Sequence, residues 1–230
     1  MIFDPMYFVF MIPGLIFMLW AQHRVKSSYA KYSKVANDAR LTGAQTARRV
    51  LDNAGLQNVA VEQIPGELTD HYDPRSRVLR LSQGVYGQPS VAAMGIAAHE
   101  AGHAIQHAKA YAPMQWRTAI VPAVNIGSNL GIFVLIAGLF LQQPTLAWVG
   151  VGLFALATVF ALLTLPVEFD ASNRAKQALA SAGLVTIDEG KGVAKVLDAA
   201  AWTYVASFAA SLLTLLYYVS LVTGMNRSGD

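Results

Sequence analysis

Two histidines lie one helical turn apart, with a glutamate directly after the first, in the run His99-Glu100-Ala101-Gly102-His103. Residues four apart share one face of a helix, so these two imidazoles could bind the same metal ion. Glu100 is rotated by about 100° around the helix and would face a water molecule as general base. Zinc held by three protein groups leaves a position open for water and lowers the pKa of that water toward ~7. The pattern is typical of zinc hydrolases and predicts His99 and His103 as ligands and Glu100 as base.

A third metal ligand is expected, and Glu168 is the first candidate. No charged residue occurs from Thr118 to Val167, which is long enough for two membrane crossings of ~20 residues each. Such a hairpin would return the chain to the side of the two histidines, where Glu168 begins a predicted helix, 168–182, just after Pro166. Asp170 is a rival ligand. Alternatively, Glu168 only caps that helix by complementing its dipole.

Other polar residues could also take part in the site. His107 continues the four-residue spacing, but one more helical turn carries it ~6 Å further on, which favours a solvent-facing or supporting position over a ligand. The oxyanion formed during hydrolysis would need a donor besides the metal, and His71, Arg174 and Tyr204 are candidates. Each has a simpler explanation: His71 could be an ordinary loop histidine, Arg174 could set the membrane orientation, and Tyr204 could lie at the membrane interface.

The composition is that of a multi-pass membrane protein. Hydrophobic residues make up 54% of the 230 residues and charged residues only 13%. Four apolar stretches predict four crossings, at 6–21, 119–141, 145–167 and 201–223. The first is the shortest and contains Pro13-Gly14, so a helix of a soluble core is its alternative.

Basic residues assign the sides of the membrane by the positive-inside rule. The basic residues that follow the first apolar stretch indicate that this stretch is an uncleaved anchor and that the segment after it is cytoplasmic. They include Arg24, Lys26, Lys31, Lys34, Arg40, Arg48 and Arg49. The segment 168–200, with Arg174, Lys176, Lys191 and Lys195, is then also inside, while Asp4 and the tail 226–230 are outside. We therefore expect a multi-pass protein of the inner (plasma) membrane whose site faces the cytoplasm. The lack of cysteine agrees with a reducing compartment.

The net charge is +3, and we expect the basic residues to orient the protein in the bilayer and to contact anionic lipid. No basic and aromatic pattern indicates nucleic-acid binding.

About a hundred residues between the first two crossings predict a small cytoplasmic domain. Thr42 and Gln45 form a capping box that opens a helix, which 53–55 closes. Two short runs of β character, 58–63 and 77–81, predict a small sheet or ribbon.

The second of these runs, extended to Ser82, is either an edge strand that pairs with an extended peptide or an ordinary member of the sheet. Ser90 then caps the helix that carries the histidines, and this helix should end before Pro113.

Three segments, in this order after an apolar anchor, resemble the YugP family of membrane zinc metallopeptidases, which belongs with the HtpX-like gluzincins. They are His71-Tyr72-Asp73-Pro74, Ala98-His99-Glu100-Ala101-Gly102-His103-Ala104 and Pro166-Val167-Glu168-Phe169-Asp170-Ala171-Ser172. The likeness covers nearly the whole chain. It implies that His99, His103 and Glu168 bind one zinc ion and that Glu100 is the catalytic base.

The chain departs from the pattern of these relatives at one position. HtpX-like proteins often carry an aspartate four residues after the ligand glutamate, where this chain has Ser172. Asp170 or Asn173 could orient a ligand histidine instead.

The expected fold is mainly α, with about four transmembrane helices and a small α+β zincin-like catalytic domain at the cytoplasmic face. The predicted domains are an amino-terminal anchor (1–21), the zincin-like domain (22–118), a transmembrane hairpin (119–167), a cytoplasmic helical segment with the third ligand (168–200), and a last transmembrane helix with its tail (201–230).

The sequence thus predicts a membrane-bound zinc endopeptidase that acts on polypeptides, membrane proteins among them. The alternative is a catalytically silent scaffold that keeps zinc for folding or binds a partner. A closed structural zinc site is disfavoured because it ordinarily uses cysteine. A zinc transporter is disfavoured because the crossings offer only Asn125, Asn129 and hydroxyl groups. No particular protein partner is indicated.

Overall fold

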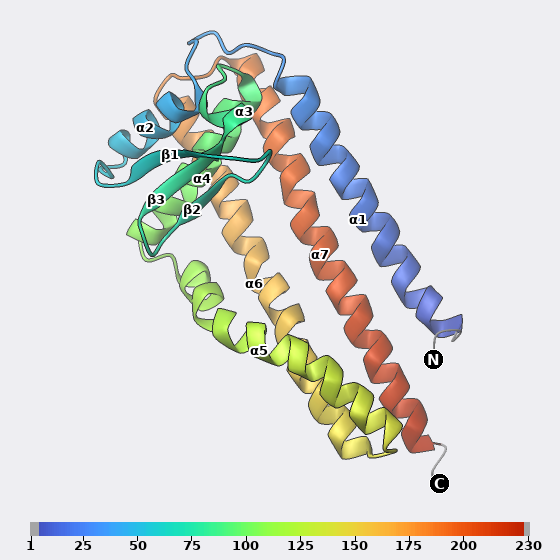
Figure 1. The fold of residues 1–230 in the computed structure, drawn as a ribbon. Helices are drawn as coiled ribbons and strands as arrows, with labels where there is room; N and C mark the ends of the chain where they lie inside the picture. Colours follow the sequence, from blue (N-terminus) through green and yellow to red (C-terminus); the bar gives the residue numbers. More distant parts are fainter. Residues whose placement is uncertain (1–4, 228–230) are drawn as a thin grey trace. The chain divides into compact units, whose positions relative to one another are not determined.

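The computed structural model describes residues 5–227 of the chain, and most of them are helical (Figure 1). Asp4 and the end of the predicted outer tail, 228–230, lie outside this described part. The chain forms two compact units, each assembled from separate segments. Within the described part, the helical unit comprises residues 5–21, 116–165 and 203–227, and the α/β unit comprises residues 22–115 and 166–202.

Four helices supply the helical unit: α1 (Pro5–Tyr32), α5 (Ala112–Phe140), α6 (Pro144–Ser181) and α7 (Ile187–Arg227). Each is long and apolar enough to cross a membrane, so the prediction of four such helices is confirmed. A continuous helix pairs its own backbone groups, as a lipid environment requires. The soluble-core alternative for the first stretch is disfavoured, because Val9, Leu15 and Ile16 are each more than half exposed.

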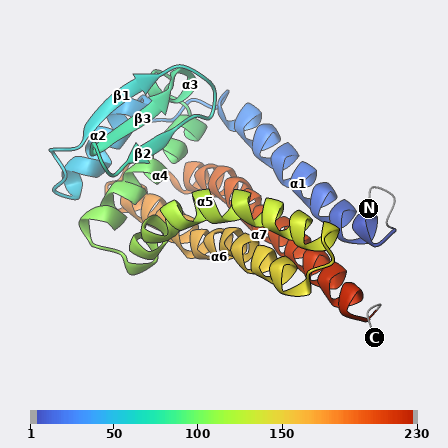
Figure 2. The same cartoon turned by 60° about the horizontal axis from the view of Figure 1, so that its bottom comes forward.

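Small residues let α5 and α6 approach closely, and the two helices lie side by side in both views (Figure 2). A Cβ atom on Gly138 would lie 2.3 Å from the backbone nitrogen of Ala147, and one on Gly150 would lie 2.3 Å from that of Leu135. Close packing of this kind stabilises helix pairs in lipid, where no hydrophobic effect drives helices together.

Helix α6 is one continuous helix, whereas the sequence predicted a crossing at 145–167 and a separate helix at 168–182. Pro166 lies inside it. A proline removes one backbone donor, but unwinding a membrane helix there would expose further unpaired groups, so continuing costs less. Glu168 is therefore in mid-helix, and the alternative that it only caps a helix start is wrong. Gly183, with φ of 62°, follows the end of α6, as predicted.

The α/β unit contains one three-stranded sheet of order β1-β3-β2. Strand β1 (Ala60–Ile64) runs parallel to β3 (Val78–Ser82), and β2 (His71–Asp73) runs antiparallel to β3. The two predicted β runs correspond to β1 and β3. Because β3 is the central strand, with neighbours on both sides, the alternative that it is an open edge for a peptide is wrong, and it is an ordinary member of the sheet.

Helix α2 (Gly43–Asn53) begins with the predicted capping box, in which Thr42 and Gln45 bond each other's backbone. A short helix, α3 (Gln83–Tyr86), links the sheet to α4 (Val91–Ala108). The Ser90 hydroxyl accepts a hydrogen bond of 3.1 Å from the backbone N–H of Ala93, as predicted for the cap of α4.

Helix α4 is the central element of the α/β unit and packs against α2 and the sheet. Most of its residues are buried, and many are alanine or glycine. The surrounding core includes Leu51, Leu79, Leu81, Met94, Leu179 and Val193. This packing holds the backbone of α4 rigidly wherever its polar side chains emerge.

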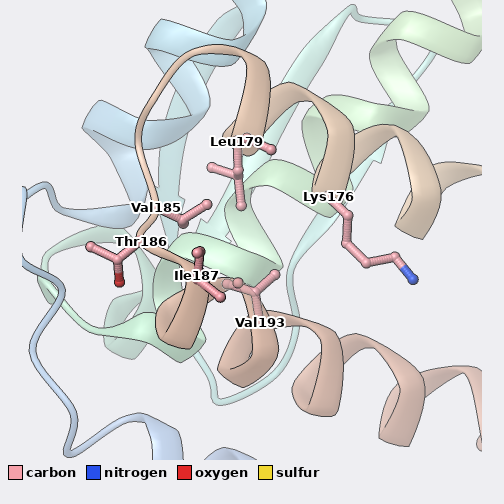
Figure 3. A pocket seen from close by; sticks show the side chains of 8 residues that line it. Lys176, Leu179, Val185, Thr186, Ile187 and Val193 are labelled. Atoms are coloured by element: carbon pink, nitrogen blue, oxygen red, sulfur yellow. The ribbon is translucent and has the colours of Figure 1, made fainter.

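A small pocket of about 260 Å³ lies in the α/β unit between the end of α6 and the start of α7 (Figure 3). Its lining is mostly apolar and includes Leu179, Val185, Ile187 and Val193 beside Lys176. None of the residues predicted for the metal site lines it.

Candidate metal centre

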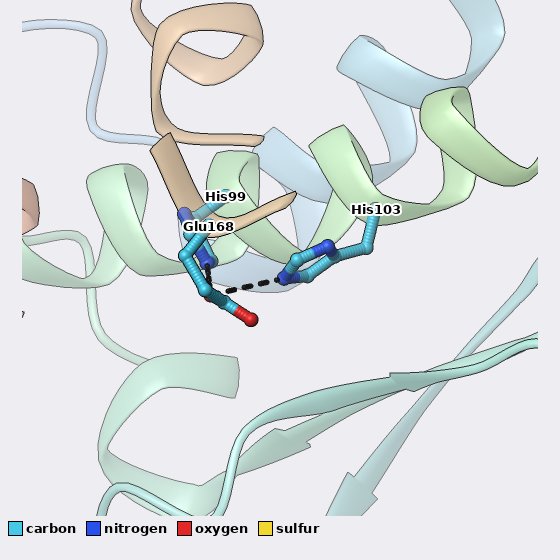
Figure 4. Close-up of side chains that lie close together, drawn as sticks. All are labelled: His99, His103 and Glu168. Carbon is cyan, nitrogen blue, oxygen red and sulfur yellow. Dashed lines mark hydrogen bonds and ion pairs between the residues drawn. The ribbon is translucent and has the colours of Figure 1, made fainter. Parts of the chain in front are cut away.

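Helix α4 presents His99 and His103 on one face, and α6 brings Glu168 against them (Figure 4). The two imidazole rings stand edge to face, with their centroids 4.8 Å apart. One Glu168 oxygen, Oε2, lies 3.3 Å from Nε2 of His99 and 3.5 Å from Nε2 of His103. One ligand atom from each residue lies within 4.8 Å of the other two. Residues 69 and 65 positions apart in the chain thus converge on one point, as the sequence predicted.

The cluster is nearly closed to solvent. The side chain of His99 is 12% exposed, that of His103 11% and that of Glu168 4%. A carboxylate buried this deeply is stable only when positive charge and hydrogen bonds compensate for its lost hydration.

The close approach of α4 to α6 depends on Gly102. A Cβ atom there would lie 2.7 Å from the carbonyl oxygen of Ala171, and backbone atoms cannot move aside as a flexible side chain can. The glycine inside the histidine motif therefore allows Glu168 to reach the imidazoles.

The outer nitrogens of both histidines have partners. Nδ1 of His99 lies 3.1 Å from the Ser172 hydroxyl, and Nδ1 of His103 lies 2.9 Å from Oε1 of Gln106. An amide oxygen can only accept, so Nδ1 of His103 carries a hydrogen, and Nε2 is the nitrogen left for a proton or a metal cation beside Glu168. Ser172 thus lies against His99 directly.

The donor set fits a zinc ion. Two imidazole nitrogens and one carboxylate oxygen match the three protein ligands of many catalytic zinc sites, in which water takes the fourth position. Burial alone would lower the pKa of His103, but the hydrogen bond and charge of Glu168 outweigh burial and raise that pKa. The carboxylate thus attracts positive charge to Nε2, which a proton or a metal cation can supply.

Glu100 follows His99 on α4 and is 8% exposed. Burial raises the pKa of its carboxyl group, while the charges of His99 and His103 act in the opposite direction. Within residues 5–227 no group donates a hydrogen bond to this carboxylate. Glu100 is therefore available to receive a proton.

The structure separates other sequence candidates from the cluster. Asp170 bonds to Gln106 and Arg174, and it is not one of the three grouped residues. His107 is exposed, as expected, and its Nδ1 lies 2.9 Å from the Tyr72 hydroxyl. Asn173 is exposed, and the Nδ1 atoms of the two histidines lie against Ser172 and Gln106 instead.

The three oxyanion candidates have other surroundings. Nδ1 of His71 lies 2.9 Å from the carbonyl oxygen of Thr69, and Arg174 pairs with Asp170. Tyr204 belongs to the helical unit, whereas the histidines belong to the α/β unit. The donor for the oxyanion stays a prediction for each of them.

Gln106 is the residue of the site that sequence analysis did not single out. It is a fully buried polar residue, and it lies on the face of α4 that carries His99 and His103. A buried glutamine three residues after a ligand histidine was the available signal, because residues three apart are neighbours on a helix.

Comparison with known proteins supports the same chemistry. Residues 7–223 match the model of a family described as "Putative neutral zinc metallopeptidase". The chain is also 48% identical, over 217 residues, to a Bacillus subtilis (strain 168) protein named "Putative membrane protease YugP". That alignment covers 94% of this chain and 96% of the relative. No solved structure matches the chain significantly.

Proposed function

Because the chain belongs to this family of neutral zinc metallopeptidases, we propose that it is a membrane-bound endopeptidase with one zinc ion at His99, His103 and Glu168. Glu100 is the proposed general base, as in gluzincins. The observation that carries the proposal is the convergence of three zinc-type ligands beside a buried glutamate that accepts no hydrogen bond within residues 5–227.

Zinc bound at this cluster would polarise a peptide carbonyl and lower the pKa of a water molecule. Glu100 takes a proton from water and passes it to the leaving amine. Burial raises the pKa of its carboxyl group, which makes it a stronger base than an exposed glutamate. His99 and His103 are held by Ser172 and Gln106, so little reorganisation is needed at the moment of reaction.

Two substitutions test this function in detergent-purified protein. Glu100→Gln should retain zinc and lower the hydrolysis of an unfolded protein by ~10²–10⁴-fold, the usual contribution of a general base. His103→Ala should lose zinc. Glu62→Gln is a matched control, because Glu62 is 54% exposed and pairs with Arg80 in the sheet, away from the three ligands. It should leave zinc content and hydrolysis unchanged.

A scaffold that keeps zinc without turnover is the competing function. Wild-type protein that binds one equivalent of zinc yet cuts neither casein nor a membrane protein would favour the scaffold. Glu100→Gln protein that stays fully active would refute Glu100 as the base.

We further propose that the site faces the cytoplasm, on the basis of the basic residues around 24–49 and 174–195. The chain has no cysteine, so single cysteines can report sidedness in the full-length protein. Gln57 is exposed between α2 and β1 on the proposed inner side, and Gln143 is exposed in the turn between α5 and α6 on the proposed outer side. Gln57→Cys should react with a membrane-impermeant thiol reagent only after cells are opened, whereas Gln143→Cys should react in intact cells. The reverse pattern would invert the proposed topology.

A further inference from the structure

Gln106 forms three hydrogen bonds although its side chain is fully buried. Its Oε1 accepts from Nδ1 of His103 at 2.9 Å. Its Nε2 donates to the carbonyl oxygen of Val167 at 2.7 Å and to Oδ2 of Asp170 at 2.8 Å. One amide thus connects a proposed zinc ligand on α4 with the residues on both sides of Glu168 on α6.

The amide of Gln106 has only one workable orientation. Val167 O and the Asp170 carboxylate are both acceptors, so the NH₂ group must face them and the oxygen must face His103. A flipped amide would place its oxygen against two acceptors and leave both without a donor. The amide oxygen therefore holds a hydrogen on Nδ1 of His103 and leaves Nε2 for the metal.

Asp170 is itself held in place. Its Oδ2 forms an ion pair with Nε of Arg174, one helical turn later, and the Arg174 guanidinium lies over the Tyr111 ring at 5.6 Å. A carboxylate behind an amide polarises it, which strengthens the bond that the amide oxygen accepts. A stronger bond to Nδ1–H makes the opposite ring nitrogen a better metal ligand.

We propose that Gln106 is a positioning residue that presents Nε2 of His103 to the metal, and that Asp170 acts through it; this inference rests on the proposed function. His99 lacks an equivalent device. Its Nδ1 meets the Ser172 hydroxyl, which can donate or accept, so Ser172 does not fix the tautomer of His99. The chain thus uses an amide and a carboxylate for one histidine and a hydroxyl for the other.

The test measures zinc affinity by competition with a chelator, together with the absorption spectrum of the cobalt-substituted protein. Gln106→Met keeps the size and burial of the side chain but removes all three hydrogen bonds. We expect zinc binding ~10–100-fold weaker and altered cobalt bands, because loss of such supporting bonds has effects of that order. Asp170→Asn should weaken zinc ~3–10-fold.

Met94→Ala is the matched control. Met94 is fully buried on α4, nine residues before His103 and on the opposite face of the helix. It should lower the melting temperature while its zinc affinity and cobalt spectrum stay those of the wild type. Equal weakening of zinc by Met94→Ala and Gln106→Met would overturn the proposal, because general destabilisation would then explain both.

The double variant tests whether Asp170 acts through Gln106. Asp170→Asn should have no additional effect on zinc affinity in the Gln106→Met background, since coupled residues are not additive. Additive effects would overturn the coupling, and wild-type affinity in Gln106→Met would overturn the positioning role. If Gln106→Met does not fold, Asp170→Asn alone decides, because its partly exposed side chain tolerates the change; wild-type zinc affinity in it overturns the proposal.

His103→Ala distinguishes failure of the positioning role of Gln106 from failure of the proposed function. Zinc loss in His103→Ala with normal binding in Gln106→Met removes only the positioning role. Normal zinc binding in His103→Ala removes the proposed metal site itself.

Discussion

Helix α6 approaches two other helices through glycine, but the two contacts have different surroundings. Toward α5, in the helical unit, a Cβ on Gly150 would lie 2.3 Å from backbone nitrogen of Leu135. Toward α4, in the α/β unit, a Cβ on Gly102 would lie 2.7 Å from the carbonyl oxygen of Ala171. The same packing device therefore serves both helix pairs.

The neighbouring residues give the two contacts different roles. The α5–α6 contact is lined by Leu135, Ala147 and Val151, which offer no polar group. Beside the α4–α6 contact, His103, Gln106 and Glu168 form hydrogen bonds and ion pairs. Close helix packing thus only brings the two backbones together, and the polar residues beside the contact decide whether a metal site can form there.

The largest effect is expected when the α4–α6 contact is widened. Gly102→Ala must push α4 away from the backbone of Ala171, which moves the histidines relative to Glu168. Hydrolysis should fall by ~10–100-fold, since a displacement of about 1 Å at a reacting centre can have that consequence, and zinc affinity should fall with it. Both are measured on the folded fraction of purified protein.

Gly95→Ala is the control on the same helix. Its added Cβ would meet a Val193 side-chain carbon at 3.3 Å, a contact that a small side-chain movement relieves. Activity close to that of the wild type is expected. Equal losses in Gly95→Ala and Gly102→Ala would show that the α4–α6 distance has no special role.

The α5–α6 contact should respond to the same change only in stability. Gly150→Ala overpacks backbone against backbone and should lower the free energy of unfolding by about 1–3 kcal/mol. Zinc affinity of the folded protein should not change, because Gly150 belongs to the helical unit and the proposed zinc ligands belong to the α/β unit. A tenfold loss of zinc affinity in Gly150→Ala would contradict the distinction between the two contacts.

Local sequence signals predicted much of the site. The four-residue spacing of His99 and His103 and the caps at Thr42 and Ser90 involve neighbours in the chain, and the structure has each helix where these signals placed it. The charge-free hairpin also predicted that Glu168 returns to the histidines, because any two crossings must bring the chain back.

Features that depend on distant residues were not predictable in the same way. Gln106 and Asp170 are 64 residues apart, and nothing local indicates their bond. The three residues of β2 form a strand only because β3 pairs with them. Pro166 indicates a helix boundary by local rules, but the surrounding apolar helix overrides it.

A smaller effect is expected at a hydrogen bond inside the helical unit. The hydroxyls of Thr158 on α6 and Ser211 on α7 lie 2.8 Å apart. Thr158→Val should lower the free energy of unfolding by ~0.6 kcal/mol, the average for hydrogen bonds between membrane helices. Thermal unfolding in detergent measures this loss of stability. Hydrolysis and zinc affinity should not change. A change in zinc affinity would contradict the expectation that this hydrogen bond is independent of the site.

The smallest effect is expected for Asp73 in the α/β unit, where stability should depend on pH as it does not at Thr158 in the helical unit. Hydrogen bonds from the Ser76 hydroxyl, the Arg75 N–H and the Arg80 guanidinium lower the pKa of Asp73, the last residue of β2, well below its ordinary value. A carboxyl group with a lowered pKa stabilises the fold above the unfolded pKa of ~3.9, and this contribution is lost as the pH falls below that value.

The melting temperature of Asp73→Asn should therefore lie slightly below that of the wild type at pH 7, and the difference should shrink as the pH is lowered toward 3. The difference between Thr158→Val and the wild type should stay constant over the same range, because neither Thr158 nor Ser211 titrates. An Asp73→Asn difference that is independent of pH would show that the turn is stabilised by its shape rather than by the charge of Asp73.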